Sequence, residues 1–188
     1  MYIMFYRQTS RKKVRKRIEE LQKRSAPLLT LPEYRRAEDA FPPDAERIQT
    51  LSYLESFAGF PSFDGTKTEY LPTGEEFIAE LTRTLEEAKR YIFLEFFIIS
   101  DGKVWSDILE VLKRKAAAGV CVRLIYDDFG CFFRLPQDYR NELKKYGIEC
   151  YSFNKFRPII TVDQNNRDHR KIAVIDGKYA FTGGTNLA

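Results

Sequence analysis

The pattern of hydrophobic and polar residues changes character about one third of the way along the chain. Residues 11–24 are predicted to form a helix, and a proline-rich linker that follows them interrupts regular structure. A second helix is predicted from an Asp44 cap to about Gly59. We therefore divide the chain into a helical segment with a linker, residues 1–61, and a main domain, residues 62–188.

From residue 66 onward, short apolar runs alternate with amphipathic stretches. The apolar runs have the length and composition of buried strands, and the amphipathic stretches repeat their apolar residues as helices do. The predicted strands are residues 66–71, 91–99, 120–128, 148–153, 171–176 and 179–184, and the predicted helices are residues 73–90, 104–119 and 136–147, the first of them beginning at Thr73. Trp105 lies at helical spacing from Ile108 and Leu112 and is predicted to belong to the core.

Strands that alternate with helices are typical of an α/β fold with a largely parallel sheet. The last two strands are predicted to form a closing hairpin after an irregular stretch near residues 154–168. We expect the apolar residues Ala173 and Ile175 of this hairpin to be exposed at an incompletely paired sheet edge. The predicted fold class is thus α/β, a mixed sheet flanked by helices, preceded by a basic helical segment.

The charge of the chain is concentrated at its N-terminus. The chain has a net charge of +4, but residues 1–24 hold nine Lys or Arg and two Glu, so this basic arm carries +7 and the remainder −3. The apolar run "MYIMFY" directly before the cluster favours an anionic membrane surface as its partner. The alternative is a basic helix that is merely solvated. The residues expected to bind the membrane are Arg11, Lys12, Lys13, Arg15, Lys16 and Arg17.

The cysteines give no indication of a disulfide framework or a metal site. Cys121, Cys131 and Cys150 are odd in number, form no Cys-x-x-Cys pair and lack His partners for zinc. We expect reduced thiols in a cytosolic setting, no structural metal and no cofactor.

The final stretch, "RDHRKIAVIDGKYAFTGGTNLA", contains the one histidine of the chain, His169. Side chains alternate along a strand, so His169 and Lys171 share one face, where Lys171 is expected to be exposed. If the hairpin loop has two residues, antiparallel pairing brings Gly184 and Asn186 to that same face. Gly183 and Gly184 would let the backbone approach a bulky anion closely.

This grouping has the chemistry of a phosphate site. A neutral imidazole can attack phosphorus, while a Lys ammonium and an Asn amide offset the charge on the phosphoryl oxygens. Taken singly, each residue also has a structural interpretation: an exposed histidine at a strand end, a solvated lysine and glycines that turn the chain. Taken together, the residues favour the phosphate site.

The spacing His169-x-Lys171-x4-Asp176-x6-Gly183-Gly184-x-Asn186 resembles the HKD motif of the phospholipase D superfamily. The flanking sequence over residues 66–188 is similar to the bacterial cardiolipin synthase branch. The resemblance implies a phospholipase D-like sheet, a metal-free mechanism and a phosphohistidine formed on His169. It implies that Lys171 and Asn186 bind phosphate beside Gly183 and Gly184, and that Asp176 orients or supports the motif.

The resemblance further implies a phosphatidyltransferase that makes cardiolipin from two phosphatidylglycerols at the cytoplasmic face of the cell membrane. The family's active site joins two such motifs, whereas this chain has a single histidine. We therefore expect the chain to be the first half of a longer enzyme, truncated after the first HKD motif, and inactive in isolation. The second HKD half would come from the same longer chain or from a homodimer partner.

Two other functions remain open. The motif also fits another phospholipase D-type phosphodiesterase that hydrolyses phospholipid or nucleic acid. The basic arm by itself fits a non-catalytic module that binds anionic lipid.

Three further features have two interpretations each. Asp127 and Asp128 end a predicted strand, where ligands of α/β sheets gather, although turn capping is the favoured role. Glu95 interrupts an apolar strand and needs either a structural partner or a place in the site. The loop "CFFRLP", residues 131–136, is predicted either to pack against the next helix or to dip into a lipid headgroup layer.

Overall fold

The computed structural model describes residues 12–29, 45–58, 65–155 and 167–188. These residues belong to two units, Arg7–Tyr70 and Leu71–Ala188, each of which is described separately below. The predicted linker, the run "MYIMFY" and Arg11 lie largely or wholly outside the described residues.

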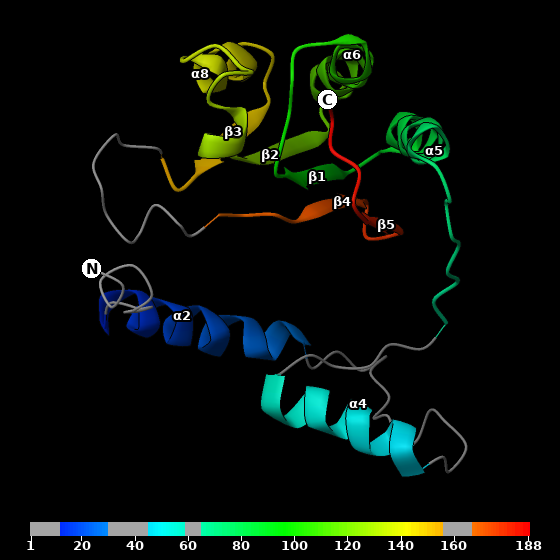
Figure 1. Cartoon of the computed structure of the whole chain (residues 1–188), viewed down its shortest axis with the longest axis vertical. Helices are drawn as coiled ribbons and strands as arrows, with labels where there is room; N and C mark the ends of the chain where they lie inside the picture. The colour runs from blue at the N-terminus through cyan, green and yellow to red at the C-terminus, as the bar shows by residue number, and fades with distance from the viewer. Residues whose placement is uncertain (1–11, 30–44, 59–64, 156–166) are drawn as a thin grey trace, which may run out of the picture. The chain divides into compact units, whose positions relative to one another are not determined.

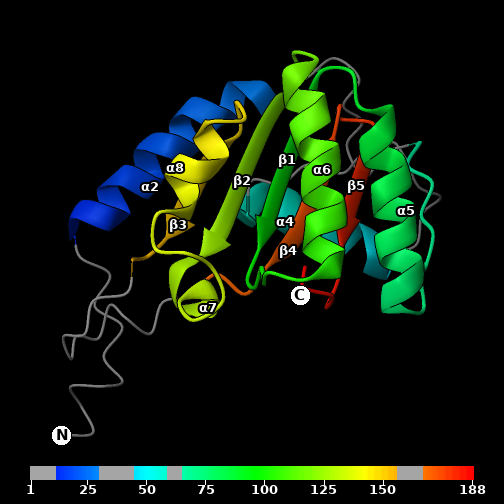
Figure 2. The same ribbon diagram turned by 90° about the horizontal axis from the view of Figure 1, so that it is seen from above.

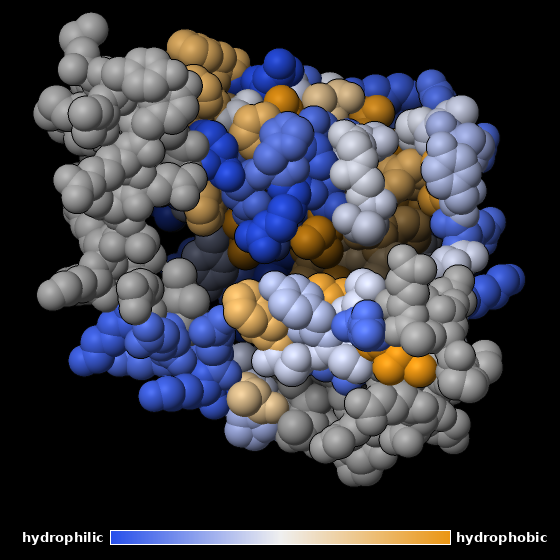
Figure 3. Space-filling view, turned by 60° about the horizontal axis from the view of Figure 1, so that its bottom comes forward, coloured by the Kyte–Doolittle hydropathy of each residue, from blue (hydrophilic) through white to orange (hydrophobic). Residues whose placement is uncertain are grey.

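The first unit contains the two helices that the sequence predicts. They are α2 (Lys12–Ser25), which continues into the 3-10 turn η1 (Ala26–Leu29), and α4 (Ala45–Ala58). Lys16 and Arg17 are exposed on α2, and hydrophilic side chains gather over this helix (Figure 3). Among the described residues, no helix is both long enough and apolar enough to cross a bilayer.

The predicted strand at residues 66–71 is wrong. The chain has no regular structure there, and the side chains of residues 66–70 are exposed, Tyr70 to 84%. Most residues of this short stretch are polar, so pairing it as a strand would bury little apolar surface. Without a buried face to stabilise it, the stretch does not form a strand.

The second unit is built on a five-stranded sheet in the order β3-β2-β1-β4-β5 (Figure 1). Strands β1, β2 and β3 are parallel, while β4 is antiparallel to both β1 and β5. The strands are β1 (Tyr91–Phe96), β2 (Cys121–Asp127), β3 (Glu149–Phe153), β4 (Lys171–Ile175) and β5 (Tyr179–Thr182). The prediction of an α/β fold with a mixed sheet is confirmed.

Helices cover one face of this sheet, where α8, α6 and α5 follow one another across the strands (Figure 2). The core lies between these helices and the strand residues that point toward them, among them Ile92, Leu94 and Phe96. Trp105 is buried as predicted and donates its indole N–H to the Tyr139 hydroxyl. The helices are α5 (Gly74–Glu87), α6 (Lys103–Ala117), the single turn α7 (Asp128–Cys131) and α8 (Tyr139–Lys144).

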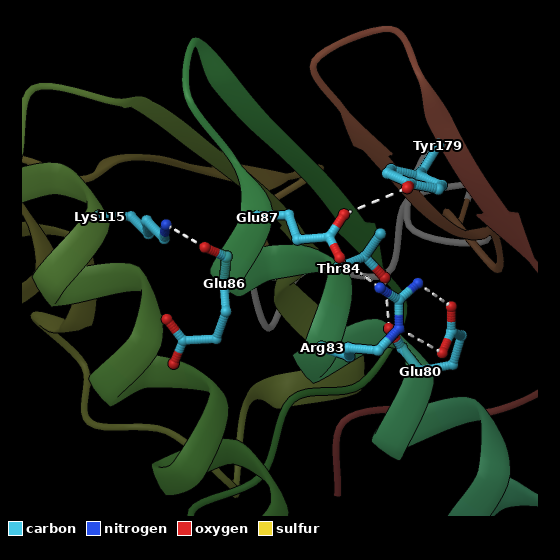
Figure 4. A network of polar contacts seen from close by, with 7 residues as sticks. All are labelled: Glu80, Arg83, Thr84, Glu86, Glu87, Lys115 and Tyr179. Atoms are coloured by element: carbon cyan, nitrogen blue, oxygen red, sulfur yellow. Dashed lines mark hydrogen bonds and ion pairs between the residues drawn. The ribbon is translucent and has the colours of Figure 1, made fainter.

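Helix α5 shows how the sequence pattern produces an element. The Thr73 hydroxyl accepts the Glu76 N–H at 3.2 Å and caps the helix, as predicted. Its apolar stripe is buried at Phe77, Leu81 and Leu85. On the exposed side, Arg83 pairs with two glutamates of the same helix, Glu80 and Glu87 (Figure 4).

The same network joins α5 to its neighbours. The Tyr179 hydroxyl of β5 donates to Glu87 Oε2 at 3.1 Å, and Lys115 of α6 donates to the Glu86 carbonyl (Figure 4). Exposed ion pairs contribute little stability individually. These contacts nevertheless attach the hairpin and α6 to two consecutive residues at the C-terminal end of α5.

The closing hairpin differs from the prediction in two respects. Its loop has three residues, because Ile175 pairs with Tyr179 across Asp176, Gly177 and Lys178. Asp176 and Gly177 both have positive φ angles, 54° and 70°, which accommodates the extra residue. The expected exposed edge is also wrong: Ala173 and Ile175 are 0% and 1% exposed, because β4 lies between β1 and β5 and faces the helices.

The three cysteines are free, as the sequence predicts. Burial raises the pKa of the Cys131 thiol to about 11 and that of Cys150 to about 12, so both are protonated at neutral pH.

Candidate functional site at the carboxyl edge of β1

Segments that are far apart in the sequence meet where β1 and β2 end. Because β4 runs antiparallel to β1, its first residue, Lys171, pairs with the last residue of β1, Phe96. The end of the chain returns to the same edge, where Leu187 forms a bridge with Ile99. Figure 2 shows α7, the start of β4 and the C-terminus all at this edge.

Phe97 joins His169 to Lys171. The exposed His169 ring lies against the Phe97 ring with centroids 4.6 Å apart, and Lys171 Nζ lies 5.1 Å from the centre of the same ring. Lys171 Nζ also donates a hydrogen bond of 2.8 Å to the His169 carbonyl. The two motif residues are therefore brought together as predicted, on an aromatic support that the sequence analysis did not identify.

The expectation that Lys171 is exposed is wrong. Only 3% of its surface is exposed, because β4 is an inner strand with alternate residues under the helices. Burial lowers the pKa of the Lys171 ammonium, and the charge on Asp168 partly opposes this effect. A desolvated ammonium attracts a phosphoryl oxygen more strongly than a solvated one does.

Asn186 reaches the site by a route other than the predicted strand face. Gly184 and Asn186 were expected on the face of His169 and Lys171 only if the hairpin loop had two residues, and the three-residue loop does not meet that condition. Instead, the chain leaves β5 after Thr182 and crosses to β1, where Asn186 Oδ1 accepts the Ile98 N–H at 3.1 Å.

Gly183 and Gly184 are exposed, and a Cβ added at either position would have no heavy atom within 4 Å. Packing within the chain therefore does not demand glycine here. The geometry leaves room above both residues, which is the space that a bulky anion would need.

Asp176 lies at the opposite end of β4 from Lys171, five strand residues or roughly 17 Å away. Its carboxylate accepts the N–H groups of Lys89, Arg90 and Tyr91, each at 2.8 Å. These bonds, that from Tyr91 foremost, hold the pKa of Asp176 below its ordinary value. The structure thus does not bring Asp176 together with His169, and its carboxylate joins the hairpin to the turn before β1.

Asp127 supports the segment that carries His169. Its side chain is fully buried and accepts the Gly130 N–H at 3.0 Å, the Asp168 N–H at 2.9 Å and a guanidinium N–H of Arg167 at 3.1 Å. The favoured role as a turn cap is therefore seen, since Gly130 lies in α7. The bonds to Arg167 and Asp168 are an additional role that spacing could not reveal, because these residues lie 40 positions away or more.

Glu95 has its partner in the residues that flank His169. Its Oε1 atom lies 2.6 Å from a guanidinium nitrogen of Arg170, and Arg170 also bonds Asp168 at 2.9 Å. Burial, and then the adjacent Asp168 carboxylate, raise the pKa of Glu95 to about 7, while Arg170 opposes the shift. Glu95 is thus half of a carboxylate pair that one arginine bridges, next to the candidate site.

The described residues form no metal-binding cluster at this site. Within the described ranges, no three His, Cys, Asp or Glu side chains are grouped so as to hold a metal ion. The groups gathered at the site are an imidazole, an ammonium and an amide, which suit an anionic ligand.

Comparison with known proteins identifies the family. The family model described as "Cardiolipin synthase, PLD-like domain" matches residues 81–188, which include every residue of the candidate site. The chain belongs to this family. The cardiolipin synthase PLD-like domain thus corresponds to most of the second unit, and the resemblance to the phospholipase D superfamily is confirmed.

Relatives of this domain include named enzymes. Cardiolipin synthase 1 of Bacillus cereus is 32% identical over 147 residues, 78% of this chain and 29% of that protein. Cardiolipin synthase of Halalkalibacterium halodurans is 37% identical over 131 residues, 69% of this chain and 26% of that protein. An uncharacterized protein of Streptococcus mutans serotype c is 43% identical over 144 residues, 77% of this chain and 31% of that protein. The chain thus spans less than a third of the length of these relatives.

Solved structures give weaker likenesses. NucT from Helicobacter pylori has a TM-score of 0.47 at 21% identity, covering 63% of this chain and 72% of that chain. Nuc from Salmonella typhimurium, a phospholipase D family member, has a TM-score of 0.45 at 22% identity, covering 58% and 64%. These likenesses do not bear on function.

Proposed function

We propose that this chain supplies the nucleophilic half of a phosphatidyltransferase site that makes cardiolipin from two phosphatidylglycerols. The observation that carries the proposal is the meeting of His169, Lys171 and Asn186 around Phe97 and Ile98. Its support from relatives is the family of the chain and its similarity to cardiolipin synthases.

In the proposed reaction, an imidazole nitrogen of His169 attacks the phosphorus of one phosphatidylglycerol. The bond from phosphorus to the glycerol headgroup breaks, glycerol leaves with a proton from a general acid, and a phosphohistidine remains. A glycerol hydroxyl of the second phosphatidylglycerol then attacks phosphorus, loses its proton and releases the imidazole. The products are cardiolipin and glycerol.

Lys171 and Asn186 would stabilise the charge that develops on the phosphoryl oxygens. The Lys171 ammonium is desolvated, and it has three N–H donors, of which one is directed to the His169 carbonyl. Asn186 uses its oxygen to accept the Ile98 N–H, so its NH₂ group is the end that can donate to phosphate. Asp176 would act at a distance, by holding the hairpin in place.

In the proposed mechanism the general acid is a second histidine, and the one histidine of this chain is already used as the nucleophile. We propose that a second HKD half supplies it, either from the same longer protein or from a partner copy. General acid help is typically worth about 10²–10⁴ in rate, so this chain by itself should be severely impaired. The basic arm, with its exposed Lys16 and Arg17, would hold the protein on the anionic cytoplasmic face of the cell membrane.

The proposal is tested by incubating two samples with phosphatidylglycerol vesicles. One sample contains the chain alone, and the other contains the chain mixed with a fragment that carries a second His-x-Lys-x4-Asp motif. Thin-layer chromatography should show cardiolipin in the mixture and none with the chain alone, and His169→Asn should abolish both product and any acid-labile phosphoryl adduct. Lys103→Met, at an exposed site on α6, is the matched control and should keep full turnover. Phosphatidic acid as product would indicate a hydrolase, and lipid binding without turnover a non-catalytic module. Turnover retained by His169→Asn would refute the nucleophile assignment.

A further inference from the structure

Alternate residues of the segment that carries the motif have different partners. His169 and Lys171 lie against the phenyl ring that follows β1. Asp168 and Arg170, by contrast, bond each other and meet the side chain of Glu95 on β1. The segment is therefore held a second time, by charged groups that the proposed reaction does not use.

Glu95 lies where β1 and β4 pair. It is opposite Ile172 in the antiparallel ladder, and Arg170 comes two residues before Ile172, so Glu95 and Arg170 are diagonal neighbours on one face of the sheet. Arg170 Nη2 lies 2.6 Å from Glu95 Oε1, and Arg170 Nε donates to Asp168 Oδ1 at 2.9 Å. One guanidinium thus spans two carboxyl groups, one from each strand segment.

The two carboxyl groups are buried, whereas the guanidinium is not. The side chains of Asp168 and Glu95 are 5% and 20% exposed, against 64% for Arg170. A largely exposed guanidinium offsets two buried negative charges only in part. Burial, and then the charge on Asp168, accordingly raise the pKa of Glu95 to about 7. Below that pH, Glu95 is a carboxylic acid that can donate its proton to the Asp168 carboxylate.

The charged groups of β2 that flank the position opposite Glu95 are engaged elsewhere. They are Arg123 and Asp127. Arg123 pairs with Glu149 at 3.0 Å, and Asp127 accepts three N–H bonds, as described above. Among the described residues around Glu95, the charged groups that respond to its proton are therefore the two that flank His169.

We propose that Glu95 is a positioning residue, which acts through Arg170 and Asp168 to hold His169 in place for an anionic phosphoryl group; the role of His169 is that of the proposed function, on which this inference rests. In its acid form, Glu95 bonds Asp168, and both share Arg170, so the residues on either side of His169 are fixed. In its carboxylate form that bond is lost and the two carboxylates repel each other. The hold on His169 should therefore weaken as pH rises through about 7.

Sulfate binding, followed through the ring proton resonances of His169, tests the proposal without turnover. Sulfate keeps its charge from pH 6 to pH 8.5, and the chain has one histidine. At pH 6, Glu95→Gln should bind sulfate as the wild type does, because its amide can donate to Asp168 as the acid does. Glu95→Ala is equally uncharged but has no donor, and it should bind roughly threefold to tenfold more weakly, the factor of one ordinary hydrogen bond. Its His169 resonances should also lose part of the shift that the Phe97 ring causes.

Glu149→Ala is the matched control. It also removes a glutamate that pairs with an arginine on the sheet, but on β3, which β2 separates from β1. It should bind sulfate as the wild type does at both pH values. At pH 8.5, the affinity of the wild type should fall to that of Glu95→Ala or below, whereas Glu95→Gln should remain the stronger binder.

Equal sulfate binding by Glu95→Ala, Glu95→Gln and Glu149→Ala would overturn the proposal, and so would a wild type that binds no sulfate or follows Glu95→Gln at both pH values. If Glu95→Ala does not fold, the comparison of the wild type with Glu95→Gln decides. The proposed chemistry is tested separately, by turnover with the second fragment. Sulfate affinities in the expected order without cardiolipin synthesis would support this inference and contradict the proposed function.

Discussion

The buried charge of Lys171 is expected to have a cost in stability. Its ammonium is almost fully buried, and burial disfavours the charged form. We therefore expect Lys171→Met, which keeps the volume and removes the charge, to leave the free energy of unfolding unchanged or to raise it by about 1 kcal/mol. Urea unfolding measures this quantity.

The same variant should lose the response of the site to phosphate. Because the chain has one histidine, the ring proton resonances of His169 report on this site alone. Inorganic phosphate should shift them in the wild type and in Lys103→Met, but not in Lys171→Met. An unfolded Lys171→Met protein would contradict the prediction and would indicate that the lysine is structural.

Glu95 is the basis of a second prediction at the residue scale, which concerns how the stability of the fold depends on pH. Its pKa is raised to about 7 in the folded protein, so between about pH 4.5 and 7 the native state keeps a proton that the unfolded state has released. Stability should therefore fall as pH rises through this window, by about 1–3 kcal/mol. The lowered pKa of Asp168 has the opposite sign and acts below this window.

Urea midpoints measured at pH 5 and pH 8 test this prediction. Glu95→Gln should flatten the difference between the two midpoints, and Glu110→Gln, at an exposed position of α6, should not. If the wild type and Glu95→Gln show the same difference, the proton on Glu95 is not the cause.

At the scale of elements, Asp176 fastens the hairpin to the turn between α5 and β1. Three backbone N–H groups converge on its carboxylate, and its φ angle of 54° is one that Asp and Asn tolerate better than Ala. Asp176→Ala should lower the free energy of unfolding by about 2–4 kcal/mol, because it removes charge-assisted bonds and leaves the amides without this partner. Asp176→Asn should recover part of the loss.

The shift of the His169 ring proton resonances on addition of phosphate distinguishes this structural role of Asp176 from a catalytic one. It should persist in folded Asp176→Asn, because Asp176 lies at the far end of β4 from the site. Loss of the phosphate response in a variant of unchanged stability would show that Asp176 acts on the site after all.

At the scale of the whole molecule, the division of charge between the basic arm and the remainder predicts salt-dependent attachment. Each Lys or Arg near an anionic bilayer contributes about 1 kcal/mol, and salt screens this attraction. Replacement of Lys12, Lys13, Lys16 and Arg17 by Gln should abolish flotation with phosphatidylglycerol vesicles at low salt. Replacement of Lys113, Lys144 and Lys145, which lie on α6 and at the end of α8, should not. Binding of the arm variant at wild-type strength would contradict the assignment.

The order and type of the elements could be predicted from the sequence because each depends on local pattern. The apolar stripe of α5 and its Thr73 cap are visible in consecutive residues, and so is the alternation that gave the α/β class. The spacing of His169, Lys171 and Asn186 likewise identified the family, because a motif is a property of the chain.

Only the tertiary structure decided what depends on contacts between distant segments. The three-residue hairpin loop changed the register, so Asn186 reaches the site through Ile98 and not along the strand face. Burial of Lys171, the aromatic support of Phe97 and the bonds of Asp127 arise because β4 inserts between β1 and β5. A strand's neighbours determine which of its residues are desolvated, and local pattern contains no record of those neighbours.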